Sequence, residues 1–315
     1  MINLFDIQKA RETIQDTIHT TPLMTSKQLS EKCGNKIFMK CEHLQKTGSF
    51  KIRGAANKVM HEARHGAKYV TAASSGNHGQ AVAYIAQQLG IKAKIVIPED
   101  AALPKIHAIR AYGASIEKCG TTSTERIPRA KEIAEKENGV FIPPYDDPYI
   151  MAGQGTIGLE ILEQMEHVDM VLVPVGGGGL ISGILTAIKE SKPCVKVIAV
   201  EPEIANDTYL SLQNKQITSI GGSSTIADGL RTSQPGELTF PIVQKYVDDI
   251  VVVSEEEIRG AFTFILERMK QLVEPSSATV VAAAMYRKLG VENKQIVSVL
   301  SGGNVELGKV EDYIL

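Results

Sequence analysis

Four short loops carry residue types that could do chemistry on a small molecule. They are GSFK at 48–51, SSGNHG at 74–79, GGGG at 176–179 and SGGN at 301–304. Each lies where a β-rich run ends or where a helical pattern begins. In an open parallel sheet, the loops at the carboxyl ends of the strands gather around the ligand. The sequence therefore predicts that the four loops converge on one site.

Lys51 is the candidate nucleophile. It falls just inside a predicted helix whose expected N-cap is Ser49, and the partial positive charge at a helix N-terminus lowers the pKa of an amine. An amine with a lowered pKa is suited to forming a Schiff base with a carbonyl compound. By position alone, a lysine in a first helical turn is more often a solvated surface charge, so the assignment depends on the other loops.

A run of four glycines lies between the apolar strand VLVPV and a helical pattern; it comprises Gly176, Gly177, Gly178 and Gly179. Backbone without side chains can aim several N–H groups at a phosphate held at a helix N-terminus. The alternatives are a flexible turn and a dinucleotide-binding GxGxxG loop. The latter belongs in the first strand-to-helix turn, whereas this run follows several strand signals. We therefore predict a phosphate site.

The loop after the strand YVTAA opens a helix and offers hydroxyl and backbone N–H groups that suit a substrate carboxylate. Its residues are Ser74, Ser75, Gly76, Asn77 and His78. Two structural interpretations stay open. One serine can act as a plain N-cap, and the histidine ring can be satisfied inside the fold rather than catalytic.

Short β-rich runs alternate with helical patterns from residue 69 onward, which is the rhythm of βαβ units and parallel sheets. Gly90 and Gly113 are placed as helix C-caps, and Ser254 with Glu257 forms a capping box. Strands are expected at 36–42, 69–74, 93–99, 114–120, 139–144, 169–176, 195–201, 248–253 and 295–300, and helices at 80–90, 104–113, 124–139, 154–165, 180–190, 278–290 and from 255 onward.

The same patterns predict the domain organisation. A compact α/β unit closes near Pro143 and Pro144, and the strand at 36–42 belongs with the second half of the chain. We expect two open, twisted parallel-sheet domains. A small domain of residues 67–146 is inserted into a large domain of residues 1–66 and 147–315.

The composition also excludes several classes of protein function. The 315 residues are 43% hydrophobic, with 34 basic and 36 acidic side chains interspersed to give a net charge of −2. No basic patch indicates nucleic acid, and no apolar run reaches the length of a membrane span. Charged residues among the first 20 exclude a signal-peptide core. The four cysteines form no CxxC pair, so we predict a reduced, cytoplasmic protein that acts on a small molecule.

Together the motifs resemble the fold-type II pyridoxal-phosphate (PLP) enzymes, the family of serine and threonine dehydratases and serine racemases. The resemblance covers most of the chain, is closest to the eukaryotic-type serine racemases, and implies the tryptophan synthase β-like fold. It rests on KTGSFKIRGA, SSGNHGQA, AGQGTIGLE, PVGGGGL, ADGLR, ERMKQLVEP and LSGGN, which occur in the family's order and approximate spacing.

The resemblance implies a role for each loop. Lys51 binds the PLP aldehyde, the four glycines hold its phosphate, Asn77 contacts the ring hydroxyl and Ser301 contacts the pyridine nitrogen. A neutral serine hydroxyl does not favour a protonated ring nitrogen, so carbanion charge delocalises less into the ring and loss of a β-hydroxyl is favoured. Substrate binding falls to residues 74–78 and to Arg126.

Ser75 is expected to separate racemisation from simple dehydration. Lys51 can exchange a proton on one ring face, and in serine racemases the serine that matches Ser75 serves the other face. Simple threonine dehydratases typically carry alanine there. A serine at a helix start can equally be only a cap.

The resemblance also implies two further ligands. All-oxygen ligation suits Mg²⁺, Mn²⁺ or Ca²⁺ rather than zinc, although a solvated acidic loop is the alternative. The residues that match the family's cation site are Glu201, Ala205 and Asp207, and those at the nucleotide (ATP) positions are Lys46, Gln80 and Tyr112.

We therefore predict a PLP-dependent serine racemase with L-serine and L-threonine dehydratase (ammonia-lyase) activity. Its products are D-serine, and pyruvate with ammonia. The alternatives are a dedicated threonine or threo-3-hydroxyaspartate dehydratase and, outside the enzymes, a PLP- or nucleotide-binding sensor. The resemblance implies a homodimer, and because the chain ends at Leu315, we expect no C-terminal regulatory domain.

Overall fold

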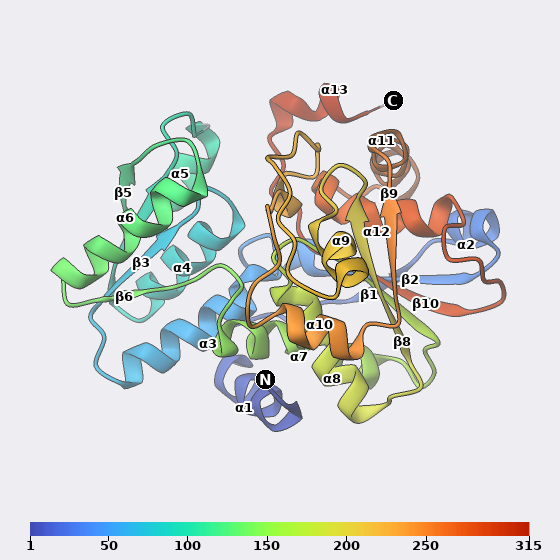
Figure 1. Ribbon diagram of the computed structural model, residues 1–315, viewed down its shortest axis with the longest axis horizontal. Coiled ribbons are helices and arrows are strands. Elements are labelled where there is room, and N and C mark those ends of the chain that lie inside the picture. The colour runs from blue at the N-terminus through green and yellow to red at the C-terminus, as the bar shows by residue number, and fades with distance from the viewer. Residues whose placement is uncertain (102, 315) are drawn as a thin grey trace.

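The computed structural model describes residues 1–101 and 103–314 and contains two sheets (Figure 1). The larger has six strands in the order β1-β2-β10-β7-β8-β9, and β1 alone runs antiparallel to its neighbour. The prediction of wholly parallel sheets is therefore wrong at this edge, because a three-residue strand is too short to leave a pattern. The strands of the larger sheet are β1 (Leu23–Thr25), β2 (Lys36–Cys41), β7 (Met170–Pro174), β8 (Lys196–Pro202), β9 (Asp249–Val253) and β10 (Gln295–Leu300).

The smaller sheet has four parallel strands in the order β5-β4-β3-β6. All four come from one stretch of chain between α3 (Lys51–Arg64) and α7 (Pro148–Gln164), so the chain enters and leaves this part once. The exact domain boundaries remain a prediction. The strands are β3 (Tyr69–Ala73), β4 (Lys92–Ile97), β5 (Ser115–Lys118) and β6 (Val140–Phe141).

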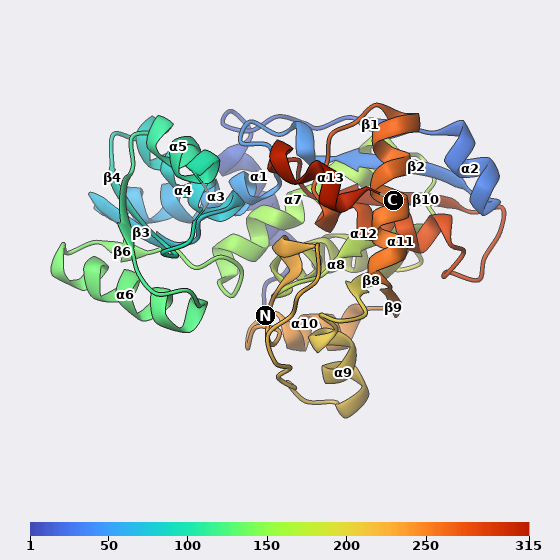
Figure 2. The same cartoon turned by 90° about the horizontal axis from the view of Figure 1, so that it is seen from above.

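Helices cover both faces of the large sheet, as its almost continuously buried strands require (Figure 2). On one face Ile157 and Ile184 pack with Val297, and on the other Phe262 and Val281 pack with strand side chains. Each such burial contributes roughly 1.5–3 kcal/mol. The first face carries α1 (Leu4–Ile14), α7, α8 (Gly179–Ser191) and α10 (Phe240–Tyr246), and the second carries α2 (Lys27–Cys33), α11 (Glu255–Phe264) and α12 (Pro275–Met285). Partly buried side chains of α9 (Asp207–Asn214) and α13 (Val310–Tyr313) pack against the first and the second core respectively.

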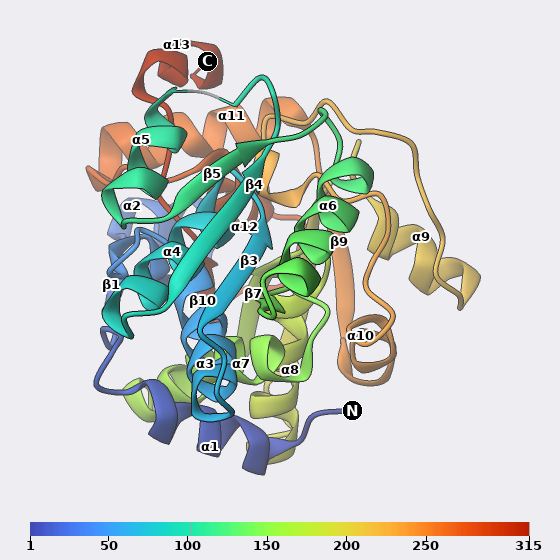
Figure 3. The same cartoon turned by 90° about the vertical axis from the view of Figure 1, so that its left-hand side faces the viewer.

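The small sheet is also covered on both faces. Figure 3 shows α4 (Asn77–Gln88) and α5 (Leu103–Ala111) on one side and α6 (Ser123–Lys136) on the other. Ile52 of α3 packs in the same core as Val82 and Ile85 of α4. Helix α3 therefore contacts the small sheet's core at the point where it also crosses α7.

Local sequence signals were correct at some helix ends and wrong at others. The capping box of Ser254 and Glu257 is confirmed, and Gly90 and Gly113 adopt left-handed φ angles of 65° and 73° after their helices. Ser49 is not the N-cap of α3, because the helix begins at Lys51 and no side chain caps it. Ser49 instead forms a bridge with Gly302 at the end of β10.

A buried ion-pair network joins β2, α3 and α7. Arg53 pairs with Glu42 at 2.8 Å and with Glu160 at 2.6 Å, and Lys40 pairs with Glu160 at 2.5 Å. All four side chains are at most 9% exposed. Breaking one partner of such a pair costs about 3–5 kcal/mol because a charge is left uncompensated. The network therefore fixes the start of α3, two residues from Lys51.

No helix within the described part of the chain is long and apolar enough to cross a membrane. The four cysteines are unbonded, and Cys33 and Cys41 are buried. The sequence-based expectation that they form no disulfide framework agrees with this.

Candidate active site

A cavity of about 300 Å³ lies between the two sheets at the carboxyl ends of their strands. Strands β3, β7 and β10 end at Ala73, Pro174 and Leu300, and the loop that follows each of them lines the cavity. Parallel strands bring their carboxyl ends to one edge, which is where ligands bind in such sheets. The four loops picked out from the sequence therefore meet. Their members in the lining are Lys51, residues 74–78, Gly176–Gly179, Ser301 and Asn304.

Lys51 reaches the cavity from the first turn of α3. Its Nζ donates a hydrogen bond to the Pro144 carbonyl oxygen at 2.8 Å, in the connection between β6 and α7. Burial lowers the pKa of Lys51 to about 8, against the opposing effect of the Glu274 carboxylate. The lowered pKa was predicted, but burial rather than a helix dipole is its main cause. Lys51 thus supplies a neutral amine near neutral pH more readily than an exposed lysine does.

In the ligand-free protein, the rate at which an amine-selective acylating reagent modifies Lys51 should follow a titration curve with an apparent pKa of about 8. Only the unprotonated amine reacts, so the rate rises with pH through this value and then levels off. Mass spectrometry of the modified peptide measures it, and a Lys51→Arg variant identifies the signal. A rate that climbs only above pH 10 would contradict the effect of burial.

The glycine loop turns from β7 into α8. Gly178, the N-cap of α8, has a left-handed φ of 90°, a conformation that side chains disfavour. A Cβ on Gly177 would stand 2.5 Å from the Tyr145 ring. The loop therefore needs glycine for its backbone shape and for its contact with Tyr145. Its N–H groups and the N-terminus of α8 border the cavity, an arrangement suited to a phosphate.

Ser301 lies at the far end of the cavity, directly after β10. Its Oγ is 3.2 Å from Ser277 Oγ of α12, and Ser277 in turn bonds both the N–H and the carbonyl oxygen of Gly302. These contacts hold the Ser301 hydroxyl in place at 5% exposure. A neutral hydroxyl therefore borders the cavity at this point.

The loop between β3 and α4 lines the wall beside Lys51. Ser74 Oγ accepts a hydrogen bond from the Gly76 N–H at 3.2 Å, and Gly76 is the N-cap of α4 without a side-chain cap. Neither serine is the N-cap, so that alternative interpretation is wrong. Ser75 lines the cavity.

The Nε2 atom of His78 has a structural role. Its Nε2 is 2.9 Å from the Ile142 carbonyl oxygen, so this nitrogen carries the proton. Burial, followed by the charge of Lys51, lowers the pKa of His78 to about 3. The ring is therefore neutral near pH 7 and ties α4 to the segment after β6, although it also borders the cavity.

Arg126 of α6 borders the cavity from the small sheet's side. Its Nη2 donates to Ser123 Oγ at 3.3 Å, whereas its buried Nε and Nη1 atoms have no hydrogen-bond partner among the described residues. Unsatisfied buried donors are costly. A cation with free donors at this place is suited to an anionic group entering the cavity.

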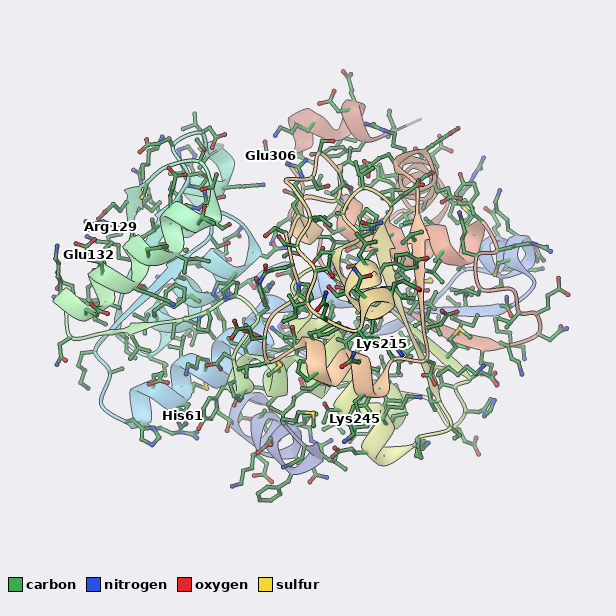
Figure 4. The ribbon with its side chains drawn as sticks, in the orientation of Figure 1. His61, Arg129, Glu132, Lys215, Lys245 and Glu306 are labelled. Carbon is green, nitrogen blue, oxygen red and sulfur yellow. The ribbon has the colours of Figure 1, made fainter. Side chains whose placement is uncertain are left out.

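Lys105 was not picked out from the sequence. It extends from α5 and pairs with Asp228 at 3.1 Å and with Glu306 at 3.4 Å, both of which follow the large sheet's strands in sequence. Figure 4 labels Glu306 at the edge of the large part that faces the small one. These ion pairs join the two parts of the structure beside the cavity. Lys105 could not be recognised from the sequence, because the periodicity of helices and strands does not reveal an ion-pair partner that is distant in the chain.

Glu201 and Asp207 form a second site at the carboxyl end of β8. Both side chains are fully buried, and Glu201 accepts hydrogen bonds from the Thr208 and Tyr209 N–H groups at 3.1 and 2.8 Å. Burial raises the pKa of Glu201 to about 8, with the nearby Asp207 as a further cause, and raises that of Asp207 to about 7. The described residues contain no cluster of three or more histidine, cysteine, aspartate or glutamate ligands. A cation here would need the Ala205 carbonyl and water.

The three residues at the predicted nucleotide positions lie in different surroundings. Gln80 of α4 is buried and lines the cavity. Lys46 belongs to the loop before α3, where its N–H donates to Gln45. Tyr112 packs edge-on against Tyr84, with ring centroids 5.3 Å apart. Their joint role stays a prediction.

Comparisons with known proteins agree with this geometry. A family model described as pyridoxal-phosphate dependent enzyme matches residues 14–302. The chain is 47% identical over 315 residues to an L-threonine ammonia-lyase of Thermotoga maritima, a match that covers all of this chain and 78% of that protein. It is 46% identical to the serine racemase of Homo sapiens, covering 97% and 92%.

A solved structure gives the same result. The structure of maize serine racemase matches with a TM-score of 0.95 at 38% identity, covering 99% of this chain and 96% of that one. The cavity, its lysine and its glycine loop lie on this shared fold. The chain therefore belongs to the pyridoxal-phosphate dependent enzymes of fold-type II.

Proposed function

We propose that this protein is a PLP-dependent serine racemase that also dehydrates L-serine and L-threonine. The observation that carries the proposal is one cavity bordered both by Lys51, whose pKa is lowered, and by Ser75. Two proton-exchanging groups on separate elements suit racemisation, which needs proton transfer on both faces of one carbon.

The residues of the cavity fit the cofactor. Lys51 supplies the amine for the aldehyde, and the loop at 176–179, where Tyr145 leaves no room for a Cβ on Gly177, suits the phosphate. Ser301 would contact the pyridine nitrogen, and Asn77 the ring hydroxyl. When bound, the cofactor withdraws electrons from the substrate's α-carbon, which makes the α-proton removable.

The chain's own groups bind the substrate and move its protons. The N-terminus of α4 would hold the substrate carboxylate with Ser74, Gly76 and Asn77, and the free Nε and Nη1 donors of Arg126 would assist from α6. Lys51 Nζ removes the α-proton on one face. A proton returned by Ser75 on the other face gives D-serine. Departure of the β-hydroxyl with a proton, as water, leaves an enamine that one water hydrolyses to pyruvate and ammonia.

The second candidate is a dedicated dehydratase for threonine or threo-3-hydroxyaspartate, and the 47% identity to a threonine ammonia-lyase favours it. A PLP- or nucleotide-binding sensor is the non-enzymatic alternative. The deciding experiment incubates the PLP-loaded protein with L-serine, L-threonine and L-threo-3-hydroxyaspartate separately. Keto acid and product chirality are followed together. D-serine beside pyruvate supports the proposal, keto acid alone supports the dehydratase, and turnover of none supports the sensor.

We also propose a divalent cation at Glu201, Asp207 and the Ala205 carbonyl. Two fully buried carboxylates beside each other are costly without a compensating charge. Oxygen ligands favour Mg²⁺, Mn²⁺ or Ca²⁺ over zinc.

Adding Mg²⁺ or Ca²⁺ to chelator-treated protein should raise its melting temperature, because a ligand at 100 times its Kd adds about 2.7 kcal/mol to stability. An Asp207→Asn variant should lose this response. A Glu203→Gln variant, changed at an exposed position of the same loop, should keep it. A wild-type melting temperature indifferent to chelator and cation would count against the site.

A homodimer and ATP binding near Lys46, Gln80 and Tyr112 are further proposals that rest on the family resemblance. Light scattering of the purified protein, with and without ATP, tests the first. Equilibrium binding of ATP to the wild type and to a Tyr112→Ala variant tests the second. The expected cytoplasmic location agrees with four unbonded cysteines.

A further inference from the structure

A chain of hydrogen bonds connects the backbone of Thr47 through Asn304 to the side chain of Asn77. Asn304 Nδ2 donates to the Thr47 carbonyl oxygen at 2.8 Å and to Asn77 Oδ1 at 2.7 Å. A carbonyl oxygen can only accept, so the atom of Asn304 that faces it must be the nitrogen. That nitrogen uses its two protons on Thr47 and Asn77, which makes the facing atom of Asn77 its oxygen.

Glu274 fixes the other end of the same amide. Asn77 Nδ2 lies 2.8 and 3.0 Å from the two carboxylate oxygens of Glu274. The Asn304 N–H donates to one of those oxygens at 2.8 Å. Glu274 is 5% exposed, and the charges of Lys51 and Lys105 act on it or are affected by it. Turning the Asn77 amide over would set its oxygen against the carboxylate and its nitrogen against a nitrogen.

The arrangement leaves Asn77 with one free donor. The two oxygens of one carboxylate subtend a smaller angle at Nδ2 than its two N–H bonds do, so one proton serves both oxygens. The Oδ1 atom is used by Asn304. The second Nδ2 proton therefore stays available for a group in the cavity, which Asn77 lines.

We infer that Glu274 and Asn304 are positioning residues that force Asn77 to present an N–H donor, never an acceptor, to the cofactor ring. This inference rests on the proposed function, in which Asn77 meets the ring hydroxyl. An oxygen that carries negative charge binds a donor and is repelled by an acceptor. Both residues border the cavity, but in this inference they act through Asn77 rather than on the reacting atoms.

The test is the affinity of the apoprotein for PLP, measured by absorbance titration of the folded protein. Asn304→Ala and Glu274→Gln should each weaken binding about tenfold, as expected for loss of one hydrogen-bond partner at a buried group. Glutamine is the gentler change at 274, yet its N–H₂ must face one of the two donors that Glu274 now accepts from, the Asn77 amide nitrogen or the Asn304 N–H. The same substitutions at exposed positions, Asn214→Ala and Glu166→Gln, are the matched controls and should bind as the wild type does.

A double-variant comparison separates positioning from direct contact. In an Asn77→Ala background, adding Asn304→Ala should weaken binding further by less than about twofold, because the residue through which it acts is gone. Additive losses would overturn the inference, as would wild-type affinity in both single variants. If the wild type itself fails to bind PLP through Lys51, the proposed function fails instead. Melting temperatures of all variants confirm that each is folded before affinities are compared.

Discussion

Replacing Lys51 with alanine is expected to abolish the absorbance near about 410 nm that PLP acquires on joining an amine. The same change should lower kcat for every hydroxy-amino acid by at least about a thousandfold. It removes both the covalent attachment and the group that takes the α-proton. The effect should be large because no other amine among the described residues lines the cavity except that of Lys105, which is held by Asp228 and Glu306.

The control for this prediction is Lys68→Ala, which makes the same substitution at an exposed position before β3. Its spectrum and turnover should match those of the wild type. Equilibrium dialysis should also show that the Lys51→Ala protein still takes up PLP weakly, because the glycine loop is intact. Unchanged absorbance near about 410 nm in Lys51→Ala would refute the assignment of Lys51.

The convergence of the four loops could be predicted from sequence for a physical reason. Strands joined by crossover helices favour parallel pairing, which every strand here except β1 adopts, and parallel strands align their carboxyl ends. Gly178 was recognisable because left-handed backbone selects glycine, and the Ser254 and Glu257 capping box because it is local in sequence. Signals that lie within a few residues of each other can be recognised in the sequence before the fold is known.

The hydrogen bonds that join Asn77 to Glu274 and Asn304 could not be found in the same way. Glu274 and Asn304 lie 197 and 227 positions from it, and each carries an ordinary polar side chain. Sequence does not distinguish a buried glutamate from an exposed one unless its partners are known. The same limit explains why Ser49 was mistaken for an N-cap. The chain enters α3 from a bridge to Gly302, a contact across 253 positions that no local pattern reports.

The lowered pKa of Lys51 was predicted correctly, but its cause is tertiary packing and not the helix dipole from which it was predicted. The pKa of Lys51 is lowered by burial rather than by the start of α3. Burial and a helix dipole predict different effects of substitution on the pKa of Lys51. A charge placed at the start of α3 would change the effect of the dipole and leave the effect of burial unchanged. The lowered pKa of Lys51 is therefore a property of its packing in the folded chain, which no local pattern in the sequence reports.

Ser75→Ala is expected to lower racemisation of L-serine by about a hundredfold or more while dehydration falls far less. The substitution removes the proton donor on one face of the substrate and leaves Lys51 on the other. Dehydration needs only the removal of the α-proton by Lys51 and the departure of the β-hydroxyl. D-serine and pyruvate formed from L-serine in the same reaction mixture give the two rates, so differences in active enzyme cancel.

Ser74→Ala is the comparison that gives this result its meaning. Ser74 lies in the same loop, borders the same cavity and accepts the Gly76 N–H, so its loss should disturb carboxylate binding and lower both activities together. Equal losses from both variants would show that Ser75 only positions the substrate. A selective loss from Ser75→Ala alone assigns the second-face proton to its hydroxyl, because only a group that acts after the α-proton has left can change the partition between the two products.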